Sequence, residues 1–331
     1  MEQKVLRIST IVVVGALLLR LLSAAAPTIS ISPTLATCMF FLQTGRLIRP
    51  ANISFTPEPP ETNPQAVQSQ EPAQPQISSP VAVPTFSEQE AALLSINCSF
   101  SYSADIPALL TEPLSWNLTG DAPTVLILHT HATEAYTPTG DYQETTAYHT
   151  TDTKYNMVSI GDHIANLLRA GGISVLHDTV LHDDPSYNDS YNNSRQSVQA
   201  YLEQYPSIRL VLDLHRDSYE DEAGNQIVRT VFSQGSQLAP LMFVVGTDYG
   251  GLTHPNWQEN LSLALKLQTQ LEKICPGICR SINLRSQRFN QDLSPRSLLI
   301  EVGACGNSQQ EALLSAEVLA ESILSLAHGS Q

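Results

Sequence analysis

Three apolar segments of the chain each lead into side chains that can bind a metal or move a proton. These side chains are His129, His131 and Glu134 after residues 124–128, His215 and Arg216 after residues 209–214, and Glu301 after residues 298–300. Catalytic zinc takes three protein ligands, often histidines with a carboxylate, and keeps one position for water. A second carboxylate beside the metal can then carry the proton of that water. The sequence therefore predicts a zinc site if the three segments are neighbours in the fold.

His131 and Glu134 are three residues apart, a spacing that one turn of helix places on the same face. The pair resembles the HxxE half-site of zinc carboxypeptidases. Taken singly, each histidine also has a structural explanation: a hydrogen bond to backbone for His131, and an ion-pair network with Asp213 and Asp217 for His215. The position of all three motifs at the ends of predicted strands favours the metal site.

Glu301 follows an apolar segment, where a carboxylate without a partner is costly to bury. A nearby metal or a role in proton transfer explains its presence. His129 could replace His131 as a ligand or support it from behind. Cys305 could act as a nucleophile, but a packed small residue is the favoured interpretation. The sequence contains no G-x-S-x-G, P-loop or HExxH motif, so other mechanisms find little support.

Apolar, β-branched segments alternate with segments of helical periodicity from residue 124 to the C-terminus. Strands are expected over residues 124–128, 173–176, 209–214, 229–233, 241–245 and 297–302, and helices over 157–168, 194–202, 260–274 and 309–326. This alternation predicts an α/β fold with a mixed, mostly parallel sheet and helices on both faces. In such sheets the chemistry collects at the carboxyl ends of the strands, where the candidate residues lie.

Residues 1–30 have the pattern of a signal anchor or transmembrane helix. Lys4 and Arg7 precede an apolar run over residues 8–26, which is long enough to span a bilayer. Three alanines at 24–26 offer a cleavage site, so removal of the segment stays open. We expect a membrane anchor with the rest of the chain outside the cytoplasm.

Residues 31–94 hold a short apolar patch and then a proline-rich stretch that cannot bury enough apolar area to order itself, which predicts a disordered linker. Residues 95–331 remain as one folded catalytic domain. The 331 residues include 17 basic and 32 acidic side chains, and this net charge of −15 at pH 7 argues against nucleic-acid binding. The five cysteines define no disulfide framework, and Cys275 and Cys279 could pair or stay as thiols.

Six motifs occur in order over roughly residues 120–328. They are residues 126–136 (LILHTHATEAY), 177–183 (HDTVLHD), 191–195 (YNNSR), 213–217 (DLHRD), 290–295 (NQDLSP) and 299–303 (LIEVG). Together they resemble stage II sporulation protein P, a cell-wall hydrolase family of endospore-forming bacteria. The anchor and the proline-rich linker also suit that family.

The resemblance implies a zinc-dependent N-acetylmuramoyl-L-alanine amidase with a phosphorylase/hydrolase-like α/β domain, and an endopeptidase activity on cross-linked stem peptides of peptidoglycan. It implies His131 and His215 as zinc ligands and Glu301 as the catalytic acid and base. Glu134 is assigned as the third ligand by its spacing. Zinc and Arg216 would hold the developing oxyanion.

The resemblance also implies partnership with stage II sporulation proteins D and M at the membrane that engulfs the forespore, where the anchored domain would face the wall. Two other functions stay open at this point. A zinc carboxypeptidase acting on stem peptides would need a dedicated arginine for the terminal carboxylate. A membrane-tethered wall-binding scaffold with a degenerate site would bind no metal.

Overall fold

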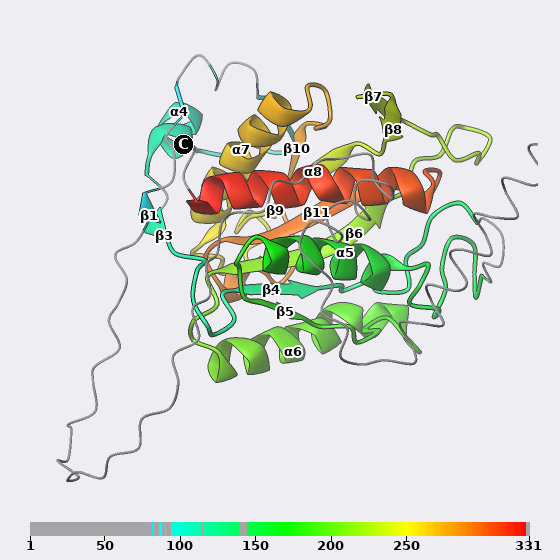
Figure 1. Cartoon of the computed structure of the whole chain (residues 1–331), viewed down its shortest axis with the longest axis horizontal. Helices are drawn as coiled ribbons and strands as arrows, with labels where there is room; N and C mark the ends of the chain where they lie inside the picture. The colour runs from blue at the N-terminus through cyan, green and yellow to red at the C-terminus, as the bar shows by residue number, and fades with distance from the viewer. Residues whose placement is uncertain are drawn as a thin grey trace, which may run out of the picture. The chain divides into compact units, whose positions relative to one another are not determined.

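A seven-stranded sheet lies at the centre of the described part of the chain in the computed structural model (Figure 1). Its strands, in order across the sheet, are β2 (Ile96–Cys98), β10 (Ile282–Arg285), β9 (Leu241–Gly246), β11 (Ser297–Ala304), β6 (Leu210–Asp217), β4 (Val125–Leu128) and β5 (Val175–His177). The structure describes residues 81–82, 86–87, 90, 94–113, 115–138 and 144–328. All of these belong to one compact unit, Pro75–Gln331.

The strands of this sheet run in two parallel blocks of opposite direction. Strands β11, β6, β4 and β5 are parallel to one another. β9 pairs antiparallel with β11, and β10 and β2 continue parallel to β9. The expected α/β fold with a mixed, mostly parallel sheet is therefore confirmed.

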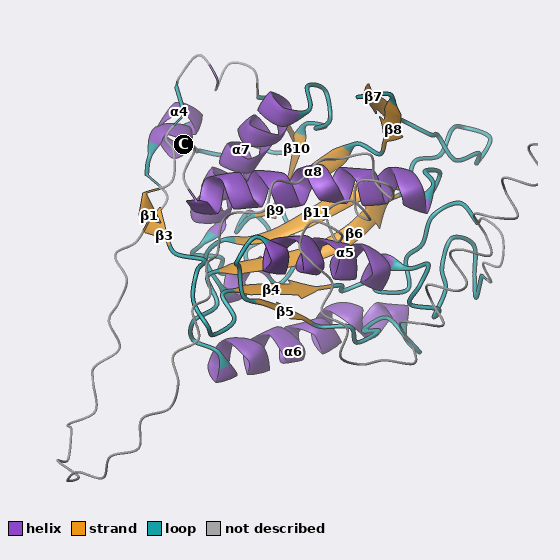
Figure 2. Ribbon diagram, in the orientation of Figure 1, coloured by secondary structure: helices purple, strands orange, loops and turns teal. Residues whose placement is uncertain are grey.

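Helices cover both faces of the sheet, as expected, but unequally (Figures 1 and 2). Helices α5 (Met157–Ala170), α7 (Trp257–Ile274) and α8 (Gln309–His328) pack on one face, while α6 (Ser190–Gln204) covers the other. The short helix α4 (Ile106–Thr111) packs against α7. The Asn156 side chain caps the start of α5 by accepting from Val158 N, and Gly171 and Gly172 follow its last residue, with Gly172 at a φ of 84°.

Alternation along the strands decides which residues face which helices. On β4, Val125 and Ile127 point into the large core beside α5, while Leu126 and Leu128 pack against α6. On β6, Leu212 and Leu214 belong to the large core, so Asp213 and His215 project toward the α6 side. On β11, Ile300 and Val302 lie in the same core, which turns Glu301 to the α6 side as well. One face of the sheet therefore receives the polar side chains of two neighbouring strands.

The remaining elements are small. They are β1 (Val81–Ala82) paired with β3 (Ser115–Trp116), the hairpin of β7 (Val231–Ser233) and β8 (Ser236–Leu238), and the 3-10 turns η1 (Tyr187–Asp189) and η2 (Gln291–Leu293). The strand expected over 229–233 thus forms as β7, but in a separate hairpin and not in the main sheet. β2 and β10 were not expected from the sequence.

Part of the expected linker contacts the folded unit. Phe86 is buried in the large core, and Glu90 forms an ion pair with Lys273, whose Nζ lies 4.5 Å from the centre of the Phe86 ring. The unit therefore takes in residues upstream of the boundary expected at residue 95. The expected anchor (1–30) and the linker up to residue 80 lie outside the described residues. Among the helices that the structure does describe, none is long and apolar enough to cross a membrane.

Candidate metal centre

His131, Glu134 and His215 meet at the carboxyl ends of β4 and β6. Each offers one ligand atom, and these atoms all lie within 4.8 Å of one another. The Nδ1 atoms of His131 and His215 are each 3.5 Å from the Glu134 carboxylate, one from Oε1 and the other from Oε2. All three residues are buried. The structure thus brings together the three residues that the sequence offered as metal ligands.

A tight turn, and not the expected turn of helix, places His131 beside Glu134. β4 ends at Leu128, and the chain then turns so that Glu134 N donates to the His131 carbonyl over 3.2 Å. The Thr133 hydroxyl and amide both donate to the carboxylate of Asp183, which fixes the turn from the far side. The i, i+3 spacing therefore brings the two side chains together through a turn and not through a helix, because a loop follows the strand directly.

Glu301 lies beside this group, on the neighbouring strand. Its Cα position on β11 is in register with that of His215 on β6. Its Oε2 atom is buried and has no hydrogen-bond partner among the described residues. Burial, with the negative charges of Glu134 and Asp217 nearby, raises the pKa of Glu301 to about 8, although the positive charge of His215 opposes the shift. A carboxyl group poised near neutral pH is suited to taking up and returning a proton.

Asp213 lies on the other side of His215 and is anchored to the first turn. Its Oδ1 is 3.0 Å from His215 Nε2, and its carboxylate accepts from both the amide and the hydroxyl of Thr130. The carboxylate therefore faces one ring nitrogen of His215 while the other ring nitrogen faces Glu134. Such a carboxylate behind a histidine is the usual support of a metal-binding imidazole.

The charges of the site favour a cation. Burial alone would lower the pKa of His215, but Asp213 and Glu134 together raise it well above the ordinary value. Burial alone would raise the pKa of Glu134, but Arg216 and the two histidines hold it well below its usual range. The negative charges of Asp213 and Glu134, which stabilise a proton on His215, also favour a positively charged metal ion beside them. Two imidazoles, one carboxylate and an unpartnered second carboxylate fit the donor set of catalytic zinc.

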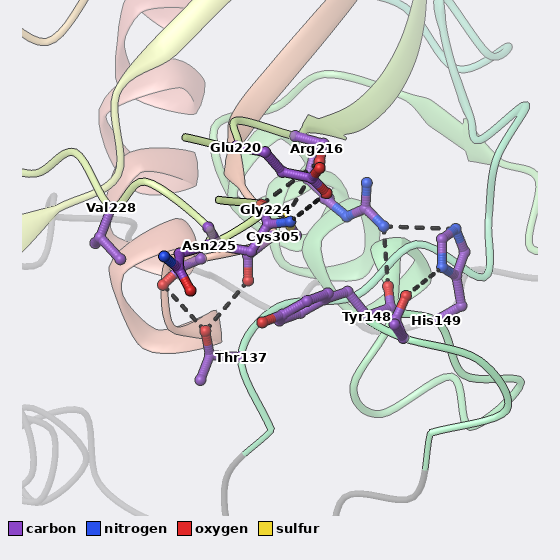
Figure 3. A pocket seen from close by; sticks show the side chains of 13 residues that line it. Thr137, Tyr148, His149, Arg216, Glu220, Gly224, Asn225, Val228 and Cys305 are labelled. Carbon is purple, nitrogen blue, oxygen red and sulfur yellow. Dashed lines mark hydrogen bonds between the residues drawn. The ribbon is translucent and has the colours of Figure 1, made fainter. Parts of the chain in front are cut away.

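Arg216 fixes the loop that carries Glu134. Its Nε donates to the Ala135 carbonyl and its Nη2 to the Tyr148 carbonyl, while Nη1 lies 3.5 Å from Glu134 Oε1. Its backbone amide also donates to Glu134 Oε2. Figure 3 shows the guanidinium turned toward Tyr148 and His149. Arg216 therefore holds the Glu134 carboxylate and closes one side of the site.

Two cavities meet at Arg216 and His149, which line both of them. The larger, of about 730 Å³, extends from Arg216 past Tyr148 to Cys305 and the loop around Asn225 (Figure 3). The smaller, of about 490 Å³, contains Glu134 and the ring of Tyr187. Of the three candidate ligands, Glu134 lines the smaller cavity.

Two tyrosines of the α6 region enclose His131. The Tyr187 ring stacks on the His131 ring at 4.2 Å between centroids, and its hydroxyl lies 3.3 Å from His131 Nδ1. The Tyr191 ring meets His131 edge-on at 5.5 Å. Burial, followed by the charge of Glu134, raises the pKa of Tyr187, so its hydroxyl keeps its proton at neutral pH.

His129 lies on the opposite face of the sheet from His131, Glu134 and His215, which together form the proposed metal-ligand group. Its Nδ1 is 3.1 Å from the Leu214 carbonyl and its Nε2 is 2.9 Å from His177 Nε2, over Gly161 of α5. His177 in turn contacts Asp162. Of the alternatives left open by the sequence, neither replacement of His131 nor direct support of its ring matches this placement.

Comparison with known proteins places the chain in a family. The family model described as stage II sporulation protein P matches residues 51–324. The chain belongs to the stage II sporulation protein P family. Stage II sporulation protein P of Bacillus subtilis (strain 168) is 29% identical over 216 residues, which are 61% of this chain and 51% of that protein. The chain thus matches about half the length of this relative.

Solved structures with a similar outline include two N-acetylmuramoyl-L-alanine amidases. AmiC2 of Nostoc punctiforme is 13% identical with a TM-score of 0.38, over 63% of this chain and 97% of that one. The enzyme from Clostridium difficile 630 is 16% identical with a TM-score of 0.37, over 64% of this chain and 100% of that one. At these TM-scores the likeness is too distant to assign a function.

The matched residues 51–324 include all four candidate site residues, which are His131, Glu134, His215 and Glu301. Sequence reasoning did not single out Tyr187, and it treated Asp213 only as a member of a structural ion-pair network. Asp213 had a usable signal, because residues i and i+2 of a strand share a face and Asp213 precedes His215 by two. Tyr187 had none, since 56 residues separate it from His131.

Proposed function

We propose that this chain is a zinc-dependent peptidoglycan hydrolase of sporulation that cleaves the amide between N-acetylmuramic acid and the L-alanine of the stem peptide, with a further activity on stem-peptide cross-links. The observation that carries the proposal is the buried His131–Glu134–His215 group with the unpartnered carboxylate of Glu301 beside it. Family membership supplies the biological setting.

His131, Glu134 and His215 would hold the zinc ion. When bound there, zinc would supply an acidified water with a pKa near 7 and a Lewis acid for the substrate carbonyl. Glu301 takes the proton of the attacking water, and its carboxyl group returns the proton to the nitrogen that leaves as the amine. Asp213 would orient the His215 ring, and Arg216, which lines both cavities, would keep Glu134 in place.

The two cavities that meet at Arg216 suit a substrate that extends to both sides of the bond to be cut. Glu134 lines the smaller cavity, so the scissile amide would lie there, and the larger cavity would take one of the flanking parts. Polar side chains such as Asn225 and Gln226 line the larger cavity, which suits a peptide or sugar chain.

Two of the arginines near the site are already engaged with other partners, which argues against a carboxypeptidase. Arg195 is committed to a two-pronged ion pair with Asp292. Arg216 spends Nε and Nη2 on backbone carbonyls. A dedicated partner for a terminal carboxylate would need a free guanidinium fork. The amidase proposal is therefore favoured over the carboxypeptidase.

The membrane anchor at residues 1–30, an extracytoplasmic catalytic domain and partnership with stage II sporulation proteins D and M belong to the same proposal. They rest on the N-terminal sequence pattern and on the family. The linker would let the domain reach wall material away from the membrane.

The decisive experiment measures bound zinc in the full-length chain, in the wild type and in His215→Ala. We expect about one zinc per wild-type chain and loss of zinc in the variant. His163→Ala is the matched control, since His163 is a half-buried residue of α5 whose Nε2 lies 3.5 Å from Glu317 of α8. Loss of binding in the control, or a folded wild type without zinc affinity, would contradict the metal site.

The reaction itself is tested by digestion of purified peptidoglycan. An amidase releases whole stem peptides with a new L-alanine amino terminus, whereas a carboxypeptidase releases single amino acids. If zinc binds but neither stem peptides nor single amino acids are released, the proposed hydrolase activity is contradicted.

A further inference from the structure

The hydroxyl of Tyr187 lies at the rim of the metal-ligand group. It is 3.3 Å from Nδ1 of His131, the same ring nitrogen that faces Glu134 Oε1 at 3.5 Å. Tyr187 is 54% exposed and lines the smaller cavity together with Glu134. The hydroxyl therefore lies between the ligand group and the space through which a substrate would enter.

The stacking contact fixes this hydroxyl in place. The Tyr187 and His131 rings lie 4.2 Å apart at an interplanar angle of 25°, and η1 anchors the tyrosine at the start of α6. When the lone pair of His131 Nδ1 binds a cation, the hydroxyl loses its acceptor but stays within the same small space. Its proton is then available to another acceptor at that position.

Arg216 is less suited to that task. Two of its nitrogens donate to the carbonyls of Ala135 and Tyr148, and the third nitrogen faces Glu134. Moving the guanidinium toward a substrate would release the loop that carries a metal ligand. The Tyr187 hydroxyl can turn toward a substrate without breaking any of these contacts.

We propose that Tyr187 is a catalytic residue that donates a hydrogen bond to the oxygen of the scissile amide. As the bond from the water oxygen to the amide carbon forms, an electron pair moves onto this oxygen, where the hydroxyl stabilises the negative charge. The pair returns as the carbon–nitrogen bond breaks and the nitrogen takes a proton from Glu301. The inference rests on the function proposed above and extends its substrate-binding residues.

The test compares three full-length chains in peptidoglycan digestion: wild type, Tyr187→Phe and Tyr187→Leu. Phenylalanine keeps the stacked ring and removes only the hydroxyl, whereas leucine removes both. Loss of one oxyanion donor lowers kcat about 100-fold or more, so Tyr187→Phe should show this loss with little change in KM. Tyr249→Phe is the matched control, because Tyr249 is exposed and follows β9, at the opposite end of the sheet.

Zinc affinity provides a readout that does not depend on activity. Zinc binding to the wild type must break the contact from the Tyr187 hydroxyl to His131 Nδ1, so Tyr187→Phe should bind zinc at least as tightly. Calorimetry with Zn²⁺ on the metal-free chains measures this directly. A large loss of zinc affinity in Tyr187→Phe would make the hydroxyl a support of the site and overturn the catalytic role.

The outcomes separate this inference from the function on which it rests. If the wild type and Tyr249→Phe release stem peptides and Tyr187→Phe does so at the same kcat, the role of Tyr187 is overturned and the amidase stands. If only Tyr187→Leu loses activity, the ring merely packs against His131, and the catalytic role of the Tyr187 hydroxyl is again overturned. If the wild type binds zinc but releases nothing, both proposals fall.

Discussion

Glu301 and His215 lie directly opposite each other on the adjacent parallel strands β11 and β6. Because neighbouring strands are about 4.8 Å apart and residues in register point to the same face, this pairing fixes the distance between the proposed proton carrier and a proposed metal ligand. The pair is set by backbone hydrogen bonds and not by a flexible loop. The site therefore has one rigid side, built by strands, and one side built by the turn at His131 and by η1.

Replacing Glu301 by Gln should abolish hydrolysis while leaving zinc binding intact. Glutamine keeps the shape but cannot accept the proton of the attacking water, and loss of such a group costs about 100- to 10,000-fold in rate. The measurement is kcat on purified peptidoglycan, with zinc content determined on the same samples. Glu259→Gln, on the outer side of α7, should match the wild type. Substantial activity in the Glu301 variant would assign the proton transfer to another group.

Glu301 should lower the stability of the metal-free protein as the pH rises from about 5 to 8. Its pKa is raised to about 8 in the folded chain, above the ordinary value of 4.5. Between these values the folded state keeps a proton that the unfolded state has released, so the free energy of unfolding falls by at most about 1.4 kcal/mol per pH unit.

Urea unfolding in the presence of a chelator, on wild type and Glu301→Gln at several pH values, measures this contribution. The glutamine variant cannot titrate, so the difference between the two free energies isolates Glu301 from the other titrating groups. Two curves that run parallel from pH 5 to 8 would contradict the raised pKa.

The meeting of the three motifs could be predicted because it follows from strand topology. Apolar runs ending in polar side chains identified β4, β6 and β11, and neighbouring parallel strands bring their ends to one edge. The antiparallel pairing of β9 with β11 could not be predicted, since it depends on the order of strands across the sheet. β10 could not be predicted, because its four residues show no marked hydrophobic pattern.

The role of His129 shows where sequence reasoning ends. Had β4 continued past Leu128, His129 and His131 would share a face by their i, i+2 spacing. The strand ends at Leu128, and the turn that follows carries His131 to the other face, beside His215. The direction of a turn is decided by contacts such as that of Thr133 with Asp183, which lie 50 residues apart in sequence.

Asp213→Asn should weaken zinc binding about 10- to 100-fold without unfolding the chain. The Asp213 carboxylate faces His215 Nε2 at 3.0 Å and fixes the ring that must present Nδ1 to the metal. Loss of such a partner typically costs this much in metal affinity. Competition with a zinc chelator measures the zinc affinity. Asp248→Asn is the control and should show no change, because Asp248 follows β9, whose end lies at the opposite end of the strands from the site. Equal zinc affinities in Asp213→Asn and Asp248→Asn would contradict a role of Asp213 in the metal site.

Gly161→Ala should destabilise the protein although alanine favours helix. A Cβ at position 161 of α5 would lie 2.4 Å from His177 Nε2 and 2.5 Å from His129 Nε2. Neither ring can retreat freely, because the Leu214 carbonyl holds His129 and the Asp162 carboxylate holds His177. The helix preference gains up to about 1 kcal/mol, while overpacking costs about 1–3 kcal/mol.

We therefore expect the free energy of unfolding to fall by up to about 2 kcal/mol in Gly161→Ala, as measured by urea denaturation. Asn166→Ala, at an exposed position of the same helix, also gains helix preference, by a smaller amount and without the clash, and should not lose stability. His129 contacts the Leu214 carbonyl, and His215 is the next residue of β6. A shift of the His129 ring would therefore also displace His215. Zinc affinity should then fall in Gly161→Ala but not in Asn166→Ala, and equal stability and affinity in both variants would mean that the two rings have room to move.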